Sequence, residues 1–181
     1  QRNLELFEPI SGDSRACLIS VIDDTNTPMG GRLLRAWLGR PLKTVERIVE
    51  RSDAVAAFVE GSLERDEARS VLESVYDIER LTAKICTAPA TPREVVGLAG
   101  SIEAATPLPD TLKELDAAYI HEAIGEMSGV GDVAAFIRSK LLDEPSAQVY
   151  DGNIIREGVS DELDELRDIH HGGRQWIAKM Q

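Results

Sequence analysis

Apolar residues that recur at three- and four-residue steps, in segments bounded by threonine, serine and proline, constrain the fold of this chain most strongly. Such spacing puts the apolar side chains of a segment on one face of an α-helix. One segment begins at Thr27 and Pro28, a helix N-cap residue followed by proline at the first helical position, and is stopped by Pro41. A helix is therefore expected there, with an apolar face of Leu33, Leu34, Trp37 and Leu38.

The same spacing predicts helices along most of the chain. A short helix is expected over residues 18–22, and a longer one from its cap Thr44 to Gly61. The period continues over residues 71–85, so adjacent helices joined by a short turn are expected. Thr91, Pro92 and Glu94 form a capping-box pattern that starts the next helix, and residues 106–109 end it. Shorter helices are expected over residues 110–127 and 132–142.

Two segments are typical of β-structure instead. Apolar and polar residues alternate over Arg2 to Phe7, which predicts a short strand. An Asp151-Gly152 pair lies between β-forming residues on both sides, which predicts a hairpin over residues 146–159. The chain is therefore expected to contain one small β element beside its helices.

A long final helix is expected from its cap, Ser160, onward. Its first turns carry Asp161, Glu162, Asp164 and Glu165, where the helix dipole favours negative charge. An apolar seam continues to Met180 without a stop signal, so the helix is expected to continue in a longer parent protein. Gly172 and Gly173 each cost about 0.5–1 kcal/mol in a helix interior, so they mark close packing, a kink or a flexible joint, with packing favoured.

These patterns predict an all-α fold: a multihelical core with one small β-hairpin and a long terminal helix. Residues 1–181 are interpreted as a single domain, because this length suits one core. It divides into a leading segment (1–14), a helical core (15–145), the hairpin (146–159) and the start of the terminal helix (160–181).

Charge and composition disfavour several classes of function. The formal net charge is −12, which repels nucleic acid, and only 4% of residues are aromatic, too few for a base-stacking platform. The apolar runs are far shorter than the roughly 20 residues that span a bilayer. No signal-peptide pattern follows Gln1, and Cys17 and Cys86 are expected to be reduced thiols. A cytoplasmic protein with no membrane partner is expected.

Candidate catalytic and metal-binding groups are few. No phosphate-binding loop is present, and His121, His170 and His171 lack a recognisable nucleophile elbow. Asp164, Asp168 and His171 share one helical face and are the best metal candidate, but a paired, solvated surface is the favoured interpretation. Trp37 is either a partner anchor or a core residue, and its apolar neighbours favour the core. No catalytic, cofactor-binding or metal-binding residue is therefore expected.

Several strings occur in an order that points to one family. They are Arg2-Asn3-Leu4-Glu5-Leu6, residues 25–30 with Arg32-Leu33-Leu34 and Trp37-Leu38, Arg40-Pro41-Leu42, residues 77–81, Pro92-Arg93-Glu94, residues 155–158 and residues 162–167. These strings resemble the MutS family of DNA mismatch-repair proteins, in its central core domain (domain III) with the start of the lever helix. Val159 replaces an aromatic residue usual in the family, and residues 100–147 match loosely.

The resemblance implies a structural and allosteric role without catalysis in this segment. In that family the full protein is a homodimer that reads mispairs with an amino-terminal domain, grips duplex DNA with a clamp at the lever tips, and hydrolyses ATP near its carboxy terminus. ATP and Mg²⁺ are thus implied for the parent protein and no cofactor for this segment. The core would connect the ATPase to the mismatch-recognition and clamp domains.

Three alternatives accompany this hypothesis. The chain could be the core of a MutS paralogue that acts in recombination, and nothing in the residues separates that role from mismatch correction. A standalone helical scaffold or adaptor is disfavoured by the uncapped end of the last helix. A helix-bundle metalloenzyme is disfavoured because the sequence lacks the metal-ligand set of such bundles.

Overall fold

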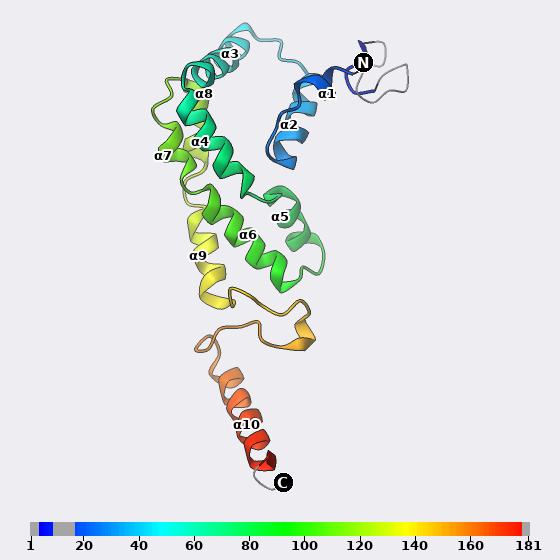
Figure 1. Ribbon diagram of the computed structural model, residues 1–181, viewed down its shortest axis with the longest axis vertical. Helices are drawn as coiled ribbons and strands as arrows, with labels where there is room; N and C mark the ends of the chain where they lie inside the picture. The colour runs from blue at the N-terminus through cyan, green and yellow to red at the C-terminus, as the bar shows by residue number, and fades with distance from the viewer. Residues whose placement is uncertain (1–3, 9–16, 179–181) are drawn as a thin grey trace.

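The computed structural model describes residues 4–8 and 17–178, excluding the side chains of residue 171 and residues 173–178. The helices form an elongated body, and the last helix extends from one end of it (Figure 1). The α-helices are α1 (Leu18–Ile22), α2 (Pro28–Gly39), α3 (Val45–Glu60), α4 (Ser62–Glu73), α5 (Ile78–Thr87), α6 (Pro92–Ala105), α7 (Leu108–Leu112), α8 (Ala118–Glu126), α9 (Gly131–Lys140) and α10 (Asp161–Ala178). The predicted helical architecture is confirmed.

Side-chain caps define the starts of α2, α5 and α6. The Thr27 hydroxyl accepts a hydrogen bond from the Gly30 amide at 3.1 Å, with Pro28 in the first turn of α2. Thr91 and Glu94 form the predicted capping box at α6. Asp77 caps α5 by accepting from the Arg80 amide at 3.0 Å. Thr44 precedes α3 as expected, but its side chain makes no capping hydrogen bond.

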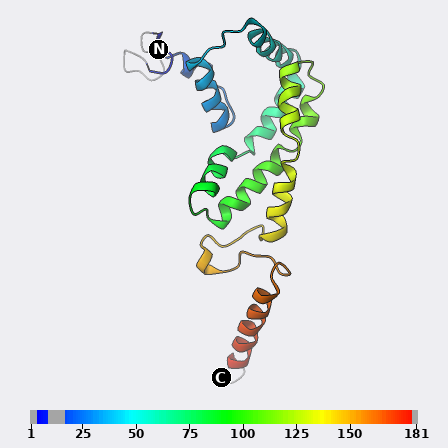
Figure 2. The ribbon, with the colours of Figure 1, turned by 180° about the vertical axis from the view of Figure 1, so that it is seen from behind.

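Two apolar clusters form the core of the body. The first joins α5, α6 and α9 through Leu81, Leu98, Ala99, Ile102, Ala134 and Ile137. The second joins α3 to the α7–α8 segment through Ala54, Leu115, Ala117 and Ile120. Helix α4 contacts α3, α6 and α7 and so lies between the two clusters, while α9 runs along α6 (Figure 2). Burying these side chains supplies the main driving force for folding.

The amino-terminal strand prediction is wrong for the residues that the structure describes. Residues 4–8 form a turn, in which Glu5 has a φ of +46°. The carbonyls of Glu5 and Leu6 accept hydrogen bonds from the amides of Leu18 and Ile19, each at 3.0 Å. These bonds satisfy amides at the start of α1 that have no partner inside the helix. Residues 2 and 3 of the expected strand lie outside the described residues.

The hairpin prediction over residues 146–159 is also wrong. Val149–Asp151 forms a 3-10 turn, and Gly152 follows with a φ of +70°. Ile155 makes an isolated antiparallel bridge with Leu141 rather than pairing across the Asp-Gly turn. The partner of Ile155 is therefore distant in sequence, which a rule for two-residue turns cannot detect.

None of the described helices is long and apolar enough to cross a membrane.

Candidate functional site

The segment between α9 and α10 folds back on itself at the end of the body. The Leu142 amide donates to the Ile154 carbonyl at 2.8 Å, and the Arg156 amide donates to the Lys140 carbonyl at 2.9 Å. These bonds flank the Leu141–Ile155 bridge, so residues 140–142 and 154–156 run antiparallel. We call this paired segment, with the first two turns of α10, the joint. It determines where α10 leaves the body.

Arg156 and Asp143 hold the centre of the joint. The Arg156 Nε donates to the Arg138 carbonyl at the end of α9 at 2.7 Å, and its Nη2 lies 2.8 Å from Asp143 Oδ2. Arg138 Nη1 approaches the other Asp143 oxygen at 3.2 Å, and Arg138 Nη2 lies 2.7 Å from Glu103 on α6. The four side chains thus form a charged network that connects α6, α9 and the returning segment.

The first turns of α10 are tied to the returning segment by a second set of polar contacts. The Gly158 amide donates to Asp164 Oδ2 at 2.6 Å, and Gly158 has a φ of +78°, which favours glycine. Arg167 pairs with Asp164 at 2.9 Å and donates to the Ile155 carbonyl at 2.8 Å. Ser160 takes its predicted capping position, with its hydroxyl 3.4 Å from the Leu163 amide.

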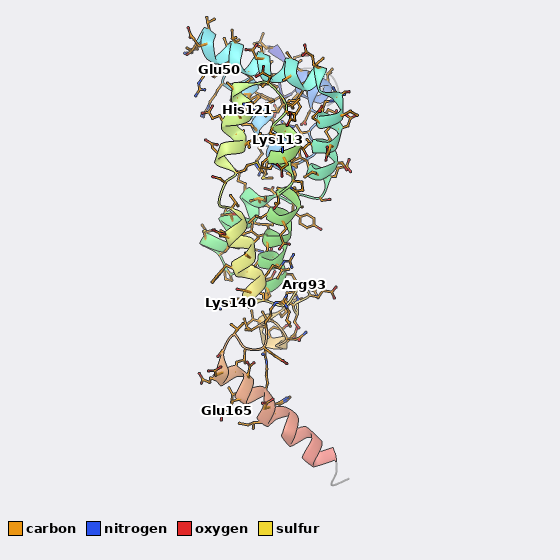
Figure 3. The ribbon with its side chains drawn as sticks, turned by 90° about the vertical axis from the view of Figure 1, so that its left-hand side faces the viewer. Glu50, Arg93, Lys113, His121, Lys140 and Glu165 are labelled. Atoms are coloured by element: carbon orange, nitrogen blue, oxygen red, sulfur yellow. The ribbon has the colours of Figure 1, made fainter. Side chains whose placement is uncertain are left out.

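A further hydrogen bond ties the segment between α9 and α10 to α6. Arg93, in the first turn of α6, donates from Nε to the Pro145 carbonyl at 3.2 Å. Figure 3 shows Arg93 and Lys140 at the end of the body from which α10 extends, and Glu165 beyond them on α10 itself. Both α6 and α9 therefore position the joint.

Pairing with arginine lowers the pKa values of the two acids in the network, Asp143 and Glu103. Hydrogen bonding from Arg156 lowers the pKa of Asp143, and hydrogen bonding from Arg138 lowers the pKa of Glu103. Asp143 is nevertheless 66% exposed and Glu103 45% exposed. Ion pairs between exposed side chains contribute little to stability, because water screens the charges. The charged network therefore orients the segments of the joint but adds little to the stability of the fold. That stability comes mainly from the apolar clusters of the body.

A similar charged contact anchors α2 to the start of α5. Arg32 Nη2 lies 2.7 Å from Asp77 and 2.6 Å from Glu79. The Arg32 hydrogen bond lowers the pKa of Asp77 to about 2. Because Asp77 also caps α5, the contact joins a helix start to a neighbouring helix.

Trp37, expected in the core, is half-buried at the surface between α2 and α3. The Arg51 guanidinium lies 3.5 Å from the centre of its ring, and Tyr119 of α8 meets it edge-on at 6.4 Å. The core interpretation of Trp37 is thus confirmed only in part, since α2 contributes no buried residue.

The metal candidate receives no support from the described part of the chain. Asp164 is engaged by Arg167 and the Gly158 amide, and the His171 side chain lies outside the described residues. No group of three or more His, Cys, Asp or Glu side chains within residues 4–8 and 17–170 could hold a metal ion. His121 lies near the end of the body opposite α10, which carries His170 (Figure 3). Cys17 is buried and Cys86 is exposed.

The sequence pointed to α10 and its cap but not to the charged network beside it. Arg138, Asp143 and Glu103 carry no motif, and the Arg138–Glu103 pair spans 35 positions. In the sequence, Arg156 stands out only as part of the family string at residues 155–158. Charged residues that pair across such distances leave no periodic signal, so only the fold reveals them.

Comparison with known proteins places this arrangement in a family. The model of the family described as MutS domain III matches residues 1–179. The chain belongs to the MutS domain III family. The resemblance drawn from its strings is thereby confirmed, and the helical body with its outgoing helix is the core segment of a MutS-family protein.

Curated relatives agree with this membership. A protein named DNA mismatch repair protein MutS from Alkaliphilus oremlandii is 38% identical over 182 residues, covering 100% of this chain and 21% of the relative. The protein of that name from Salinibacter ruber is also 38% identical, covering 100% of this chain and 20% of the relative. One from Clostridioides difficile is 38% identical over 99% of this chain and 19% of the relative. The domain III chain thus spans about a fifth of the length of these relatives.

Proposed function

We propose that this domain III segment is the mechanical core of a DNA mismatch-repair protein, and that it transmits conformational change between an ATPase and DNA-binding parts. The observation that carries the proposal is the joint, where α10 leaves the body through polar contacts rather than through an apolar core. The names of the curated relatives support the mismatch-repair context.

The chemistry of the joint suits a lever that changes its angle. Coupling between two sites requires an element with two arrangements that both sites bias. Hydrogen bonds and exposed ion pairs exchange partners at little cost, whereas a packed core resists small displacements. Arg156 ties the returning segment to α9 and to Asp143, and Arg167 ties α10 to the Ile155 carbonyl, so a movement of the returning segment or of α10 would exchange these contacts rather than open the apolar clusters.

The remaining parts of the proposed machine lie elsewhere in the parent protein. We assign ATP, Mg²⁺ and duplex DNA to other domains, together with the contacts of a homodimer, and no catalytic group to this segment. A recombination paralogue would use the same core, so the substrate of the parent is what separates the two roles.

Arg156→Gln in the full-length parent protein tests the proposal. The measurement is the factor by which ATP changes affinity for a mismatched duplex, determined by fluorescence anisotropy. Allosteric coupling typically amounts to about 5- to 150-fold, and we expect the variant to lose at least half of the coupling free energy. Arg80→Gln, an exposed arginine on α5 with no ion pair among the described residues, is the matched control. A coupling factor in Arg156→Gln equal to that of the control contradicts the proposal.

The glycines of α10 provide a second test. A Cβ added at Gly172 would meet no described atom within 4 Å, so packing against the described residues does not explain that glycine. If Gly172 and Gly173 make the lever compliant, replacing both with alanine changes the ATP-dependent coupling factor in the parent protein while each binding activity survives. An identical coupling factor would reject the compliant lever and leave the joint as the moving part.

A further inference from the structure

The groove between α2 and α3 is lined by apolar side chains and belongs to neither apolar cluster. It has a volume of about 520 Å³ and is lined mainly by Leu34, Trp37, Leu38, Pro41, Ile48 and Val55. Val55 is 59% exposed and Ile48 44% exposed, so these side chains face solvent along the groove. Exposed apolar surface of this kind marks interaction sites in soluble proteins.

The exposed face of α3 has the spacing of a helix-packing seam. Val45, Ile48, Ser52, Val55 and Val59 follow one another at steps of three and four residues, along the full length of the helix. Val45 and Val59, at its two ends, are each 67% exposed. A stripe with this period packs against another helix. An occupant with the same period, about four turns long, would cover the seam and the groove together.

The charges around the groove are opposite in sign to those of the whole chain. Between Arg35 and Arg51 there are five cations and two carboxylates, in a chain whose formal net charge is −12. Arg40 and Lys43 flank the groove residues Pro41 and Leu42, are exposed, and have no ion pair among the described residues. The rim of the groove therefore carries unneutralised positive charge.

Arg51 adds an unpaired donor inside the groove itself. Its guanidinium stacks on Trp37, and its buried Nε has no hydrogen-bond partner within the part of the chain that the structure describes. Guanidinium groups pair well with carboxylates, so the groove offers one polar anchor within an apolar lining.

We propose that the α2–α3 groove binds an acidic amphipathic helix of a partner segment. The apolar face of that helix lies on the α3 seam, and its carboxylates pair with Arg51 and with the rim cations Arg40 and Lys43. A phosphate backbone has no apolar face to cover the leucines and valines of this groove, which favours a peptide over nucleic acid. The acidic remainder of the chain does not cancel the rim, because charges more than about 8 Å away are screened at physiological salt.

The test uses the 181-residue chain and two fluorescein-labelled peptides of about three heptads. Both peptides have leucine at the seam positions, and the flanking positions carry glutamate in one and lysine in the other. We expect the glutamate peptide to bind at least about fivefold more tightly by anisotropy, because three cations contribute. The net charge of the chain taken alone would predict the reverse order. A lysine peptide that binds equally or more tightly overturns the proposal.

Variants locate the binding site. The triple change Arg40→Gln, Lys43→Gln and Arg51→Gln should remove the preference for glutamate, while Val55→Asp should weaken both peptides at least about fivefold. Lys113→Gln with Lys140→Gln removes two cations outside the groove and should preserve the preference. Circular dichroism checks folding, and Arg40→Gln with Lys43→Gln alone provides a variant whose lost side chains have no ion pair to break. A preference that survives the triple change overturns the proposal.

Two other occupants give distinct results. A labelled DNA duplex that binds the chain and is lost in the triple variant would assign the groove to nucleic acid. Self-association in analytical ultracentrifugation that Val55→Asp abolishes would assign it to a second copy of the chain. Either result overturns the acidic-helix proposal, and neither bears on the joint, so failure here is distinguishable from failure of the proposed function.

Discussion

At the scale of single residues, a small buried polar group can join two segments of the chain by hydrogen bonds. Ser101 is completely enclosed, yet its hydroxyl donates to the Gly97 carbonyl at 2.9 Å and accepts from the Tyr76 amide at 3.1 Å. One hydroxyl thereby connects α6 to the turn between α4 and α5. A buried donor without a partner costs more than the hydrogen bond contributes when it is made.

Ser101→Ala should therefore lower the free energy of unfolding by about 1–2 kcal/mol, because the Tyr76 amide loses its acceptor. Ser52→Ala is the matched control, since its hydroxyl makes only an exposed bond to the Ile48 carbonyl of its own helix. Urea denaturation with an unchanged slope measures both. Equal midpoints for the two variants would show that the Tyr76 contact is not stabilising.

Glu94 supports a pH-dependent contribution to stability. Lys84 lies 2.6 Å from its carboxylate, and this contact, together with hydrogen bonds from Thr91, lowers the pKa of Glu94 to about 2. Since the folded-state pKa is depressed, the stabilisation is complete above the ordinary value of 4.5 and disappears as pH falls toward about 2.

Glu94→Gln should accordingly lower the melting temperature at pH 7, and the difference from the unmodified chain should shrink steadily below about pH 4.5. Glu114→Gln removes an exposed carboxylate that has no ion pair among the described residues, and it controls for the loss of one charge. Melting temperatures of both variants and of the unmodified chain, measured from pH 7 to pH 3, test this prediction. A difference that stays constant from pH 7 to pH 3 would rule out the Lys84 contact as its source.

At the scale of helices, some glycines are required because a neighbouring side chain fills the space of a Cβ, and others have room for a larger residue. Gly61, where the sequence predicts the end of a helix, lies at the junction of α3 and α4 and has a φ of −83°, so its backbone does not require glycine. Its hydrogen atom instead makes room for Leu115, since an added Cβ would overlap that side chain and lie 3.1 Å from the Ala57 carbonyl. Gly97, inside α6, has no described atom within 4 Å of the same position.

The two positions should respond oppositely to alanine. Gly61→Ala is expected to destabilise the chain by about 1–3 kcal/mol through overpacking against Leu115. Gly97→Ala is expected to stabilise it by about 0.5–1 kcal/mol, because alanine loses less backbone freedom in a helix. Urea midpoints measure both changes. Stabilisation by Gly61→Ala would mean that Leu115 moves aside freely.

Helices with local signals were predictable, and those without them were not. Thr27-Pro28 and the Thr91–Glu94 box located α2 and α6, because a cap and its helix lie within a few residues of each other. The break between α7 and α8 has no such signal, so the prediction merged them into one helix over residues 110–127. The Asp151-Gly152 pair suggested a hairpin because the rule is local, whereas Ile155 pairs with Leu141.

At the scale of the whole molecule, net charge limits what the chain binds unaided. Its formal charge of −12 opposes contact with phosphates, and the cations Arg40, Lys43 and Arg51 lie at an apolar groove. In the proposed function, DNA binding is therefore assigned to other domains of the parent protein. The candidate site was less predictable than the fold, since the joint depends on charge pairs that only the folded chain brings together.

The isolated chain should consequently discriminate mismatched from matched duplex by less than tenfold, about 1.4 kcal/mol. Anisotropy at near-physiological salt measures this preference, and the full-length parent protein serves as the positive control. A preference of tenfold or more in the isolated chain would place mismatch recognition inside domain III.

The two apolar clusters have a consequence for how the body opens. One cluster joins α5, α6 and α9, and the other joins α3 to the α7–α8 segment, with α4 in contact with both sides. Proteins built in this way open in cooperative units rather than all at once. Amide protons of α3 and α8 should then exchange with solvent as one group and those of α6 and α9 as another. The two halves of the body would report separate opening free energies, with α4 as the boundary at which one half can unfold while the other stays native.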